Sequence, residues 1–272
     1  MLPLSFTTLG CPGWTLQKII ENAAKMGFDG VDFRGLLNAL DITTCTEFTN
    51  DLPATKRRLS DHGISVSGIA TSARFAVVNA DELEHNFDEA RRNMALAAEL
   101  RAPVLRVYGG RVPEGHTVET ILPVLVENLH KIGEEAEDYG VTLALETHDD
   151  WTDSLVFARL MREVSHPRVR VLWDLHHPYR TNGESAQTTY RNLSPYTVSS
   201  HVKDSVPTAD GGHQYVLLGE GDVPLKEMLD LLVAGGYEGY AILEWEKRWT
   251  PSLPEPEVAF PQYVAKMHEW LD

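Results

Sequence analysis

Short apolar runs alternate with segments of helical spacing along the whole chain. The runs are rich in β-branched residues and predict strands at Leu4–Thr8, Gly30–Arg34, Ile64–Ala70, Val104–Tyr108, Val141–Glu146, Val169–Asp174, Val198–Lys203 and Tyr240–Glu244. Between them, apolar residues recur every three or four positions, as in Leu225, Met228, Leu229 and Leu232. This spacing predicts amphipathic helices with one buried face. Glycines suited to left-handed helix caps follow several helices, at Gly27, Gly63, Gly140 and Gly236.

Eight strands separated by helices predict a parallel sheet buried on both faces. A length of 272 residues is typical of a (β/α)8 barrel. A GxGxxG fingerprint, which would favour an open dinucleotide-binding sheet, does not follow the first strand. We therefore predict the α/β class and a single (β/α)8 TIM barrel domain over residues 1–272. Two long loops are predicted at its active end, Asp204–Leu218 and Trp249–Glu257.

Composition narrows the classes of partner. The formal net charge is −16, which disfavours nucleic acid and anionic membranes as partners, because both bind through Lys and Arg. Neither an apolar run long enough to span a membrane nor a secretory signal peptide is expected. The two cysteines, Cys11 and Cys45, make no disulfide framework, and we expect a cytoplasmic protein.

Ionisable residues stand where the last four apolar runs end. The runs read VTLALETHDD, VRVLWDLHHP, VSSHVKD and AILEWE, and they end at Glu146, Asp174, His201 and Glu244. Because the carboxyl ends of barrel strands meet at one rim, these side chains are predicted to converge. Three carboxylates and one imidazole suit Mn²⁺, Mg²⁺, Co²⁺ or Zn²⁺. The sequence thus predicts one divalent metal ion held by these four residues.

The chain resembles the xylose isomerase-like TIM barrel family, which includes sugar phosphate isomerases and epimerases and the apurinic endonuclease 2 group. The segments LSFTTLG, GFDGVDFR, LALETH, WDLHHP, HVKD, LGEGDVPL and GGYEGYAILEWE carry the resemblance, in the order that the family has them. The resemblance implies the same four metal ligands. It also implies that Glu146 and Glu244 form the acid/base pair, that His177 contacts the substrate, and that the protein is a homodimer.

The chain departs from the motifs of two branches of the family, the keto-sugar epimerases and the endonucleases. The keto-sugar epimerases have an arginine soon after the metal histidine, whereas VKDSVPTAD after His201 has none. The endonucleases have an Asp-x-His pair in that region and further histidines after the third and fourth strands. This chain has Ala70-Thr71 and Tyr108-Gly109 at those strand ends, which argues against DNA repair.

The residues predict a metal-dependent isomerase or epimerase of a small polyhydroxy ketone. One glutamate removes the proton next to the carbonyl, giving an enediolate, and the other returns a proton. Loss of a β-hydroxyl from the same enolate gives the alternative, a dehydratase of the inosose or 3-dehydroshikimate type. A third interpretation is a metal-binding barrel without turnover. Further substrate contacts are expected from the side chains near these strand ends, His148, His177, Lys203, Trp14 and Trp245.

Overall fold

A computed structural model describes residues 2–271. Its strands are β1 (Leu4–Thr7), β2 (Gly30–Phe33), β3 (Ser65–Arg74), β4 (Val104–Tyr108), β5 (Thr142–Glu146), β6 (Val169–Asp174), β7 (Thr197–Val202), β8 (Asp204–Pro207), β9 (His213–Val216) and β10 (Ala241–Leu243). Eight of them form a closed parallel barrel in the order β1, β10, β7, β6, β5, β4, β3, β2. The predicted (β/α)8 fold is confirmed.

Helices follow the strands as the apolar spacing predicts. They are α1 (Leu16–Met26), α2 (Leu52–Asp61), α3 (Ala80–Leu100), α4 (Val118–Tyr139), α5 (Ser154–Val164), α6 (His177–Asn182), α7 (Ala186–Leu193), α8 (Leu225–Ala234) and α9 (Pro256–Leu271). Short 3₁₀ turns lie at Thr8–Gly10, Ile42–Thr44 and Thr46–Phe48. The predicted stripe of α8, Leu225, Met228, Leu229 and Leu232, is fully buried. No helix among residues 2–271 is long and apolar enough to cross a membrane.

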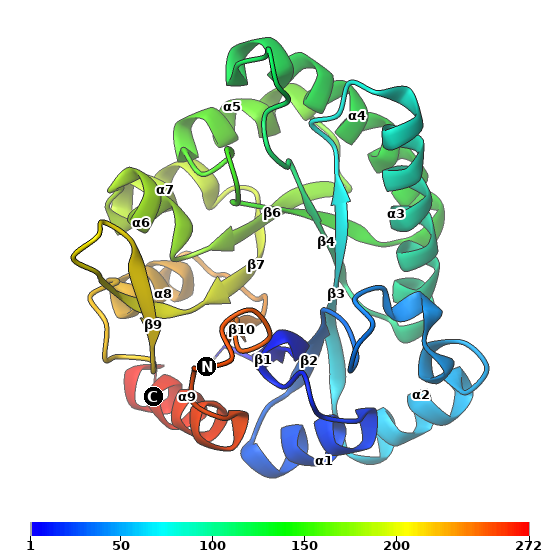
Figure 1. Ribbon diagram of the computed structural model, residues 1–272, viewed down its shortest axis with the longest axis vertical. Coiled ribbons are helices and arrows are strands. Elements are labelled where there is room, and N and C mark those ends of the chain that lie inside the picture. The colour runs from blue at the N-terminus through cyan, green and yellow to red at the C-terminus, as the bar shows by residue number, and fades with distance from the viewer. Residues whose placement is uncertain (1, 272) are drawn as a thin grey trace. The chain divides into compact units, whose positions relative to one another are not determined.

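The chain divides into two compact units. In the first unit, residues 2–67 and 200–271, strand β1 pairs with β2 and β10, and helices α1 and α9 lie side by side (Figure 1). Helix α1 begins where the Thr15 side chain accepts the Lys18 N–H and ends at Gly27, whose φ of +87° is left-handed. The other three predicted cap glycines also have positive φ.

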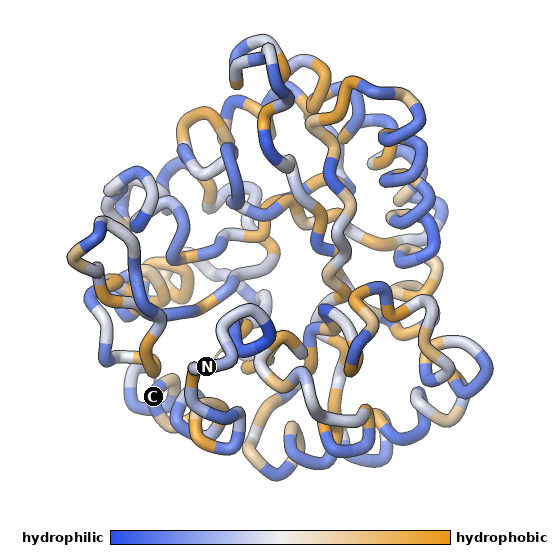
Figure 2. Tube along the Cα trace, viewed as in Figure 1, coloured by the Kyte–Doolittle hydropathy of each residue, from blue (hydrophilic) through white to orange (hydrophobic). Residues whose placement is uncertain are grey.

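The second unit, residues 68–199, contains β4, β5 and β6 with α3 to α7 around them. Helices α3 and α4 pack against each other beside β4 and β5 (Figure 1). Figure 2 shows hydrophilic and hydrophobic residues alternating along both helices, as one-sided burial requires. Val104, Ala144 and Leu172 from β4, β5 and β6 pack into one apolar cluster between the strands.

One predicted loop has structure of its own. Within the predicted long loop Asp204–Leu218, β8 and β9 pair as an antiparallel hairpin. Its turn is closed by the Thr208 N–H donating to the Gly212 carbonyl, and Gly211 has a φ of +85°. An Asp-Gly-Gly turn between two short alternating runs is a hairpin signal. That residues 1–272 make a single domain stays a prediction.

Candidate metal and proton-transfer site

Polar side chains lie above the apolar cluster of the second unit. Side chains on one face of a strand recur every two residues. Two positions beyond Val104, Ala144 and Leu172 come Arg106, Glu146 and Asp174. All three are almost fully buried, with relative exposures of 1%, 0% and 0%. Strands β4, β5 and β6 therefore carry an ionisable layer next to an apolar one, with Glu146 and Asp174 at the carboxyl ends of their strands.

Glu146 is the last residue of β5 and is paired with a buried cation. Arg106 on the neighbouring strand places its Nη1 3.3 Å from Oε2 of Glu146. The guanidinium also lies over the Tyr108 ring, 4.0 Å from its centre. A buried carboxylate is stable in its charged form only beside such a partner. Arg106 thus accounts for how Glu146 can stay ionised inside the protein.

Asp174 ends β6 and is held by backbone groups. Its Oδ1 accepts the N–H groups of His176 and His177, at 2.8 and 3.3 Å. Its Oδ2 lies 3.3 Å from Nε2 of His177. Asp174, His176 and His177 offer ligand atoms within 4.8 Å of one another, so this cluster of acidic and histidine side chains can hold a metal ion. The predicted substrate contact His177 therefore lies beside a predicted ligand.

His148 lies between Tyr108, the last residue of β4, and His177, the first residue of α6. Its ring centre is 4.7 Å from that of Tyr108 and 4.9 Å from that of His177. Its Nδ1 lies 3.2 Å from Oδ2 of Asp149. The hydrogen bond from His148 is the main reason that the pKa of Asp149 is lowered. His148 thus lies beside His177, which in turn lies beside Asp174.

In the first unit, the predicted ligands His201 and Glu244 contact each other. Nδ1 of His201 lies 3.3 Å from Oε1 of Glu244, and both residues are buried. Lys203, which follows β7, forms a close ion pair with Glu244 and lies 3.4 Å from Glu246. Burial by itself would raise the pKa of Glu244, but the charges of Lys203 and His201 hold that pKa well below its usual range.

The two predicted aromatic contacts are packed inside the first unit. Trp14 is 5% exposed, with its ring edge-on to Phe260 at 5.7 Å. Trp245 is 2% exposed, and its Nε1 donates to the Pro254 carbonyl at 2.9 Å. Both rings have the surroundings of core residues. Contact of either tryptophan with a substrate stays a prediction.

The segments HVKD and LGEG are joined by one carboxylate. Asp204 accepts the N–H groups of Gly219 and Gly221 on Oδ2, at 2.9 and 3.0 Å, and that of Ser205 on Oδ1. A Cβ on Gly221 would stand 2.0 Å from Oδ1 of Asp204, so this approach requires glycine. Burial raises the pKa of Asp204, against the effect of these N–H donors. The hydrogen bonds of Asp204 thus give a structural reason for the segments HVKD and LGEG.

The sequence prediction missed Arg106 and Tyr108. Neither stands at a strand end rich in polar residues, since both belong to the run VLRVY. A charged residue inside an apolar strand run is nevertheless a signal, because a buried charge needs a partner. Alternation along β4 would have placed Arg106 on the same face as Val104 and Tyr108.

Comparison with known proteins finds one matching family model and a curated relative that is similar over most of the chain. The model of the xylose isomerase-like TIM barrel family matches residues 20–271. Fructoselysine 3-epimerase of Escherichia coli O157:H7 is 23% identical over 252 residues, which cover 87% of this chain and 88% of that protein.

Two solved structures share the fold over nearly all of the chain. The probable 3-DHS dehydratase AsbF of Bacillus anthracis has a TM-score of 0.80 at 18% identity and covers 100% of both chains. The 3-keto-D-glucoside 4-epimerase YcjR of E. coli has a TM-score of 0.79 at 14% identity, covering 99% of this chain and 100% of that one. Different reactions are thus named for proteins with this fold.

Proposed function

The chain belongs to the xylose isomerase-like TIM barrel family, and on that premise we propose that it is a divalent-metal-dependent epimerase or isomerase of a small polyhydroxy ketone. One observation carries the proposal. Two buried carboxylates, Glu146 and Glu244, stand at the carboxyl ends of barrel strands, and each is paired with a buried cation. Two such carboxylates are what proton removal and proton return beside a carbonyl require.

Glu146, Asp174, His201 and Glu244 are proposed to hold one metal ion together. Each is buried and offers one oxygen or nitrogen ligand atom. Support also comes from the strand order, in which β5, β6, β7 and β10 are consecutive. Three carboxylates and an imidazole are a donor set for Mn²⁺, Mg²⁺, Co²⁺ or Zn²⁺. When bound, such an ion polarises a carbonyl and stabilises negative charge on its oxygen.

The protein's own groups then move the proton. Arg106 and Lys203 favour the ionised forms of Glu146 and Glu244, so either can accept a proton at neutral pH. One glutamate removes the proton from the carbon next to the substrate carbonyl, which leaves an enediolate. Return of a proton to the opposite face of that carbon gives an epimer, and return to the neighbouring carbon gives an isomer. His148 and His177, whose ring centres lie 4.9 Å apart, are proposed to donate hydrogen bonds to substrate oxygens.

Solvent hydrogen exchange tests the shared first step. Protein purified without chelator is analysed for metal and incubated in D₂O with keto-sugars or inososes, and deuterium at the carbon next to the carbonyl is followed by NMR. We expect about one equivalent of metal and exchange that falls at least ~100-fold in Glu146→Gln and in Glu244→Gln. Glu134→Gln, at a side chain 66% exposed on α4, is the matched control and should exchange normally.

Two results would count against the proposal. Full exchange in either glutamate variant would remove that residue from the acid/base pair. Absence of metal, with no rise in the thermal midpoint on adding the four ions, would remove the metal site. An enone or aromatic absorbance that grows with the reaction would show loss of water from the same enolate, and the enzyme would then be a dehydratase.

A further inference from the structure

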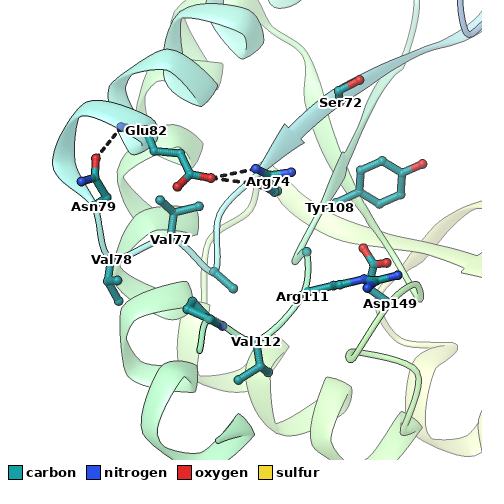
Figure 3. Close-up of a pocket in the computed structure, with 13 residues that line it drawn as sticks. Ser72, Arg74, Val77, Val78, Asn79, Glu82, Tyr108, Arg111, Val112 and Asp149 are labelled. Atoms are coloured by element: carbon teal, nitrogen blue, oxygen red, sulfur yellow. Dashed lines mark hydrogen bonds and ion pairs between the residues drawn. The ribbon is translucent and has the colours of Figure 1, made fainter. Parts of the chain in front are cut away.

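A pocket of about 560 Å³ opens at the carboxyl ends of β3, β4 and β5, within the second unit (Figure 3). Its polar lining includes Arg74, Tyr108, Arg111 and Asp149. Tyr108 lies opposite Glu146 in the pairing of β4 with β5, and Asp149 follows Glu146 by three residues. The pocket therefore begins next to a proposed proton acceptor. Its volume is within the usual range for small-molecule sites, about 300–1,000 Å³.

The walls of this pocket are fixed by hydrogen bonds between its loops. Nε1 of Trp151 donates to the Gly110 carbonyl at 2.8 Å, and the Val112 N–H donates to Asp150 at 2.6 Å. A Cβ on Gly109 would stand 2.3 Å from the Trp151 ring, so the β4 loop can pack here only as glycine. The loops after β4 and β5 thus form one braced wall. Because the loops of such a wall are already ordered, binding a ligand there does not carry the entropic cost of ordering them.

Backbone strain lies in the same wall. Asp149 has a φ of +50°, in the left-handed region that a residue with a Cβ seldom adopts. Its carboxylate is engaged by His148, whose Nδ1 is 3.2 Å away. Strained backbone conformations cost free energy and cluster at binding and active sites. The strain is a second sign that this wall is shaped for a ligand.

The two arginines of the pocket differ in their ion pairs. Arg74 is bound by Glu82, with Nη2 2.8 Å from Oε1. Arg111 is exposed and forms no ion pair within 4.0 Å among residues 2–271. In Figure 3 its side chain extends toward Asp149, whose pKa is lowered first by the hydrogen bond from His148 and also by the charge of Arg111. A guanidinium in this setting pairs well with a carboxylate, through two parallel hydrogen bonds.

We propose that this pocket is a second subsite, which binds a carboxylate-bearing substituent of the keto-sugar through Arg111. The proposal deepens and rests on the proposed function, because the sugar portion would lie beside Glu146 on the neighbouring strand. The substrate class is then a keto-sugar joined to an acidic group. An unsubstituted ketohexose carries no carboxylate for Arg111 to bind.

Two probes that differ in one group test the subsite. N-(1-deoxy-D-fructosyl)glycine carries a carboxylate, and its glycinamide counterpart carries a neutral amide in that place. Calorimetry measures the binding of each, and NMR in D₂O measures exchange at C3. We expect the wild-type protein to bind the carboxylate probe at least tenfold more tightly, and Arg111→Gln to reduce that preference to below about threefold. Arg111→Lys should retain part of it.

Arg57→Gln is the matched control, because it makes the same change at an exposed position of α2 and should keep the full preference. Circular dichroism confirms that each variant is folded. The subsite is overturned if the two probes bind equally, if neither binds, or if the preference survives in Arg111→Gln. Normal hydrogen exchange at C3 in the same protein would still leave the proposed function standing. A preference that disappears in Arg111→Gln, in a protein that exchanges no hydrogen at C3, supports the subsite and counts against the proposed function.

Discussion

The ion pair of Arg106 and Glu146 should contribute to stability in a way that depends on both charges. Arg106→Met keeps a long apolar side chain and removes the guanidinium. Because both side chains are at most 1% exposed, Glu146 would be left as a buried charge without its nearest cation. Removing one partner of a buried pair costs about 3–5 kcal/mol. For a chain of this length, that loss corresponds to a fall of about 6–20 °C in the thermal midpoint.

A double-mutant cycle in urea, with chelator present, measures the coupling. Glu146→Gln should also destabilise, because it leaves Arg106 as the unpaired charge. The double variant carries neither charge, so its loss should be smaller than the sum of the two single losses by about 2 kcal/mol or more. Arg159→Met is the control. Its ion pair with Glu119 has side chains 43% and 66% exposed, so its loss should be below about 1 kcal/mol.

The result that would refute this reasoning is additivity. If the losses of the two single variants simply add, the charges do not stabilise each other, and the 3.3 Å contact has no energetic meaning. A metal titration separates this test from the proposed function. If a divalent ion binds at Glu146, it should stabilise Arg106→Met more than the wild-type protein, because the ion replaces the missing positive charge.

Two further predictions concern groups away from the site. Burial raises the pKa of the Cys11 thiol strongly, and that of Cys45 is also raised, chiefly by burial. Iodoacetamide at pH 8 should therefore modify the partly exposed Cys45 slowly and Cys11 only after unfolding; mass spectrometry of native protein with modified Cys11 would contradict this. Burial, helped by His130, lowers the pKa of His166, whose Nδ1 accepts the Arg168 N–H at 3.2 Å. Because the unfolded chain binds that proton more readily, the stabilising contribution is fully present above about pH 6.5 and is lost as the pH falls through the lowered pKa of the folded protein. The urea midpoint of His166→Asn should therefore change less between pH 7 and pH 5 than that of the wild-type protein, and an identical pH dependence would contradict the assignment.

The strands were predictable because burial on both faces leaves continuous apolar runs. Two runs, Val104–Tyr108 and Val169–Asp174, have the predicted bounds in the structure. The last strand is shorter than its run, Ala241–Leu243, because strand bounds follow backbone pairing and hydropathy does not report pairing. The hairpin of β8 and β9 was missed for the opposite reason. Its burial is incomplete, so its apolar pattern is weak, and only its glycine turn marks it.

The candidate ligands were predictable from a rule about position, since ionisable residues that close an apolar strand run face the active end of a barrel. The same rule could not find Arg106, which lies in the middle of its run. It also could not find Arg111, which becomes part of a pocket only when the loops after β4 and β5 meet. Contacts between loops depend on tertiary structure, such as the bond from Trp151 to Gly110.

The two cations beside the glutamates explain how the proposed site can both hold a metal and move a proton. Burial favours the protonated form of a carboxyl, and a protonated carboxyl is a poor ligand and no base. Arg106 and Lys203 each supply a positive charge that opposes this effect, from a strand or strand end next to its glutamate. A cation this close also competes with a metal ion for the same oxygen atoms. Each glutamate has two oxygens, so one can remain with the arginine or lysine while the other coordinates the metal ion. The carboxylate then keeps its negative charge with and without the metal.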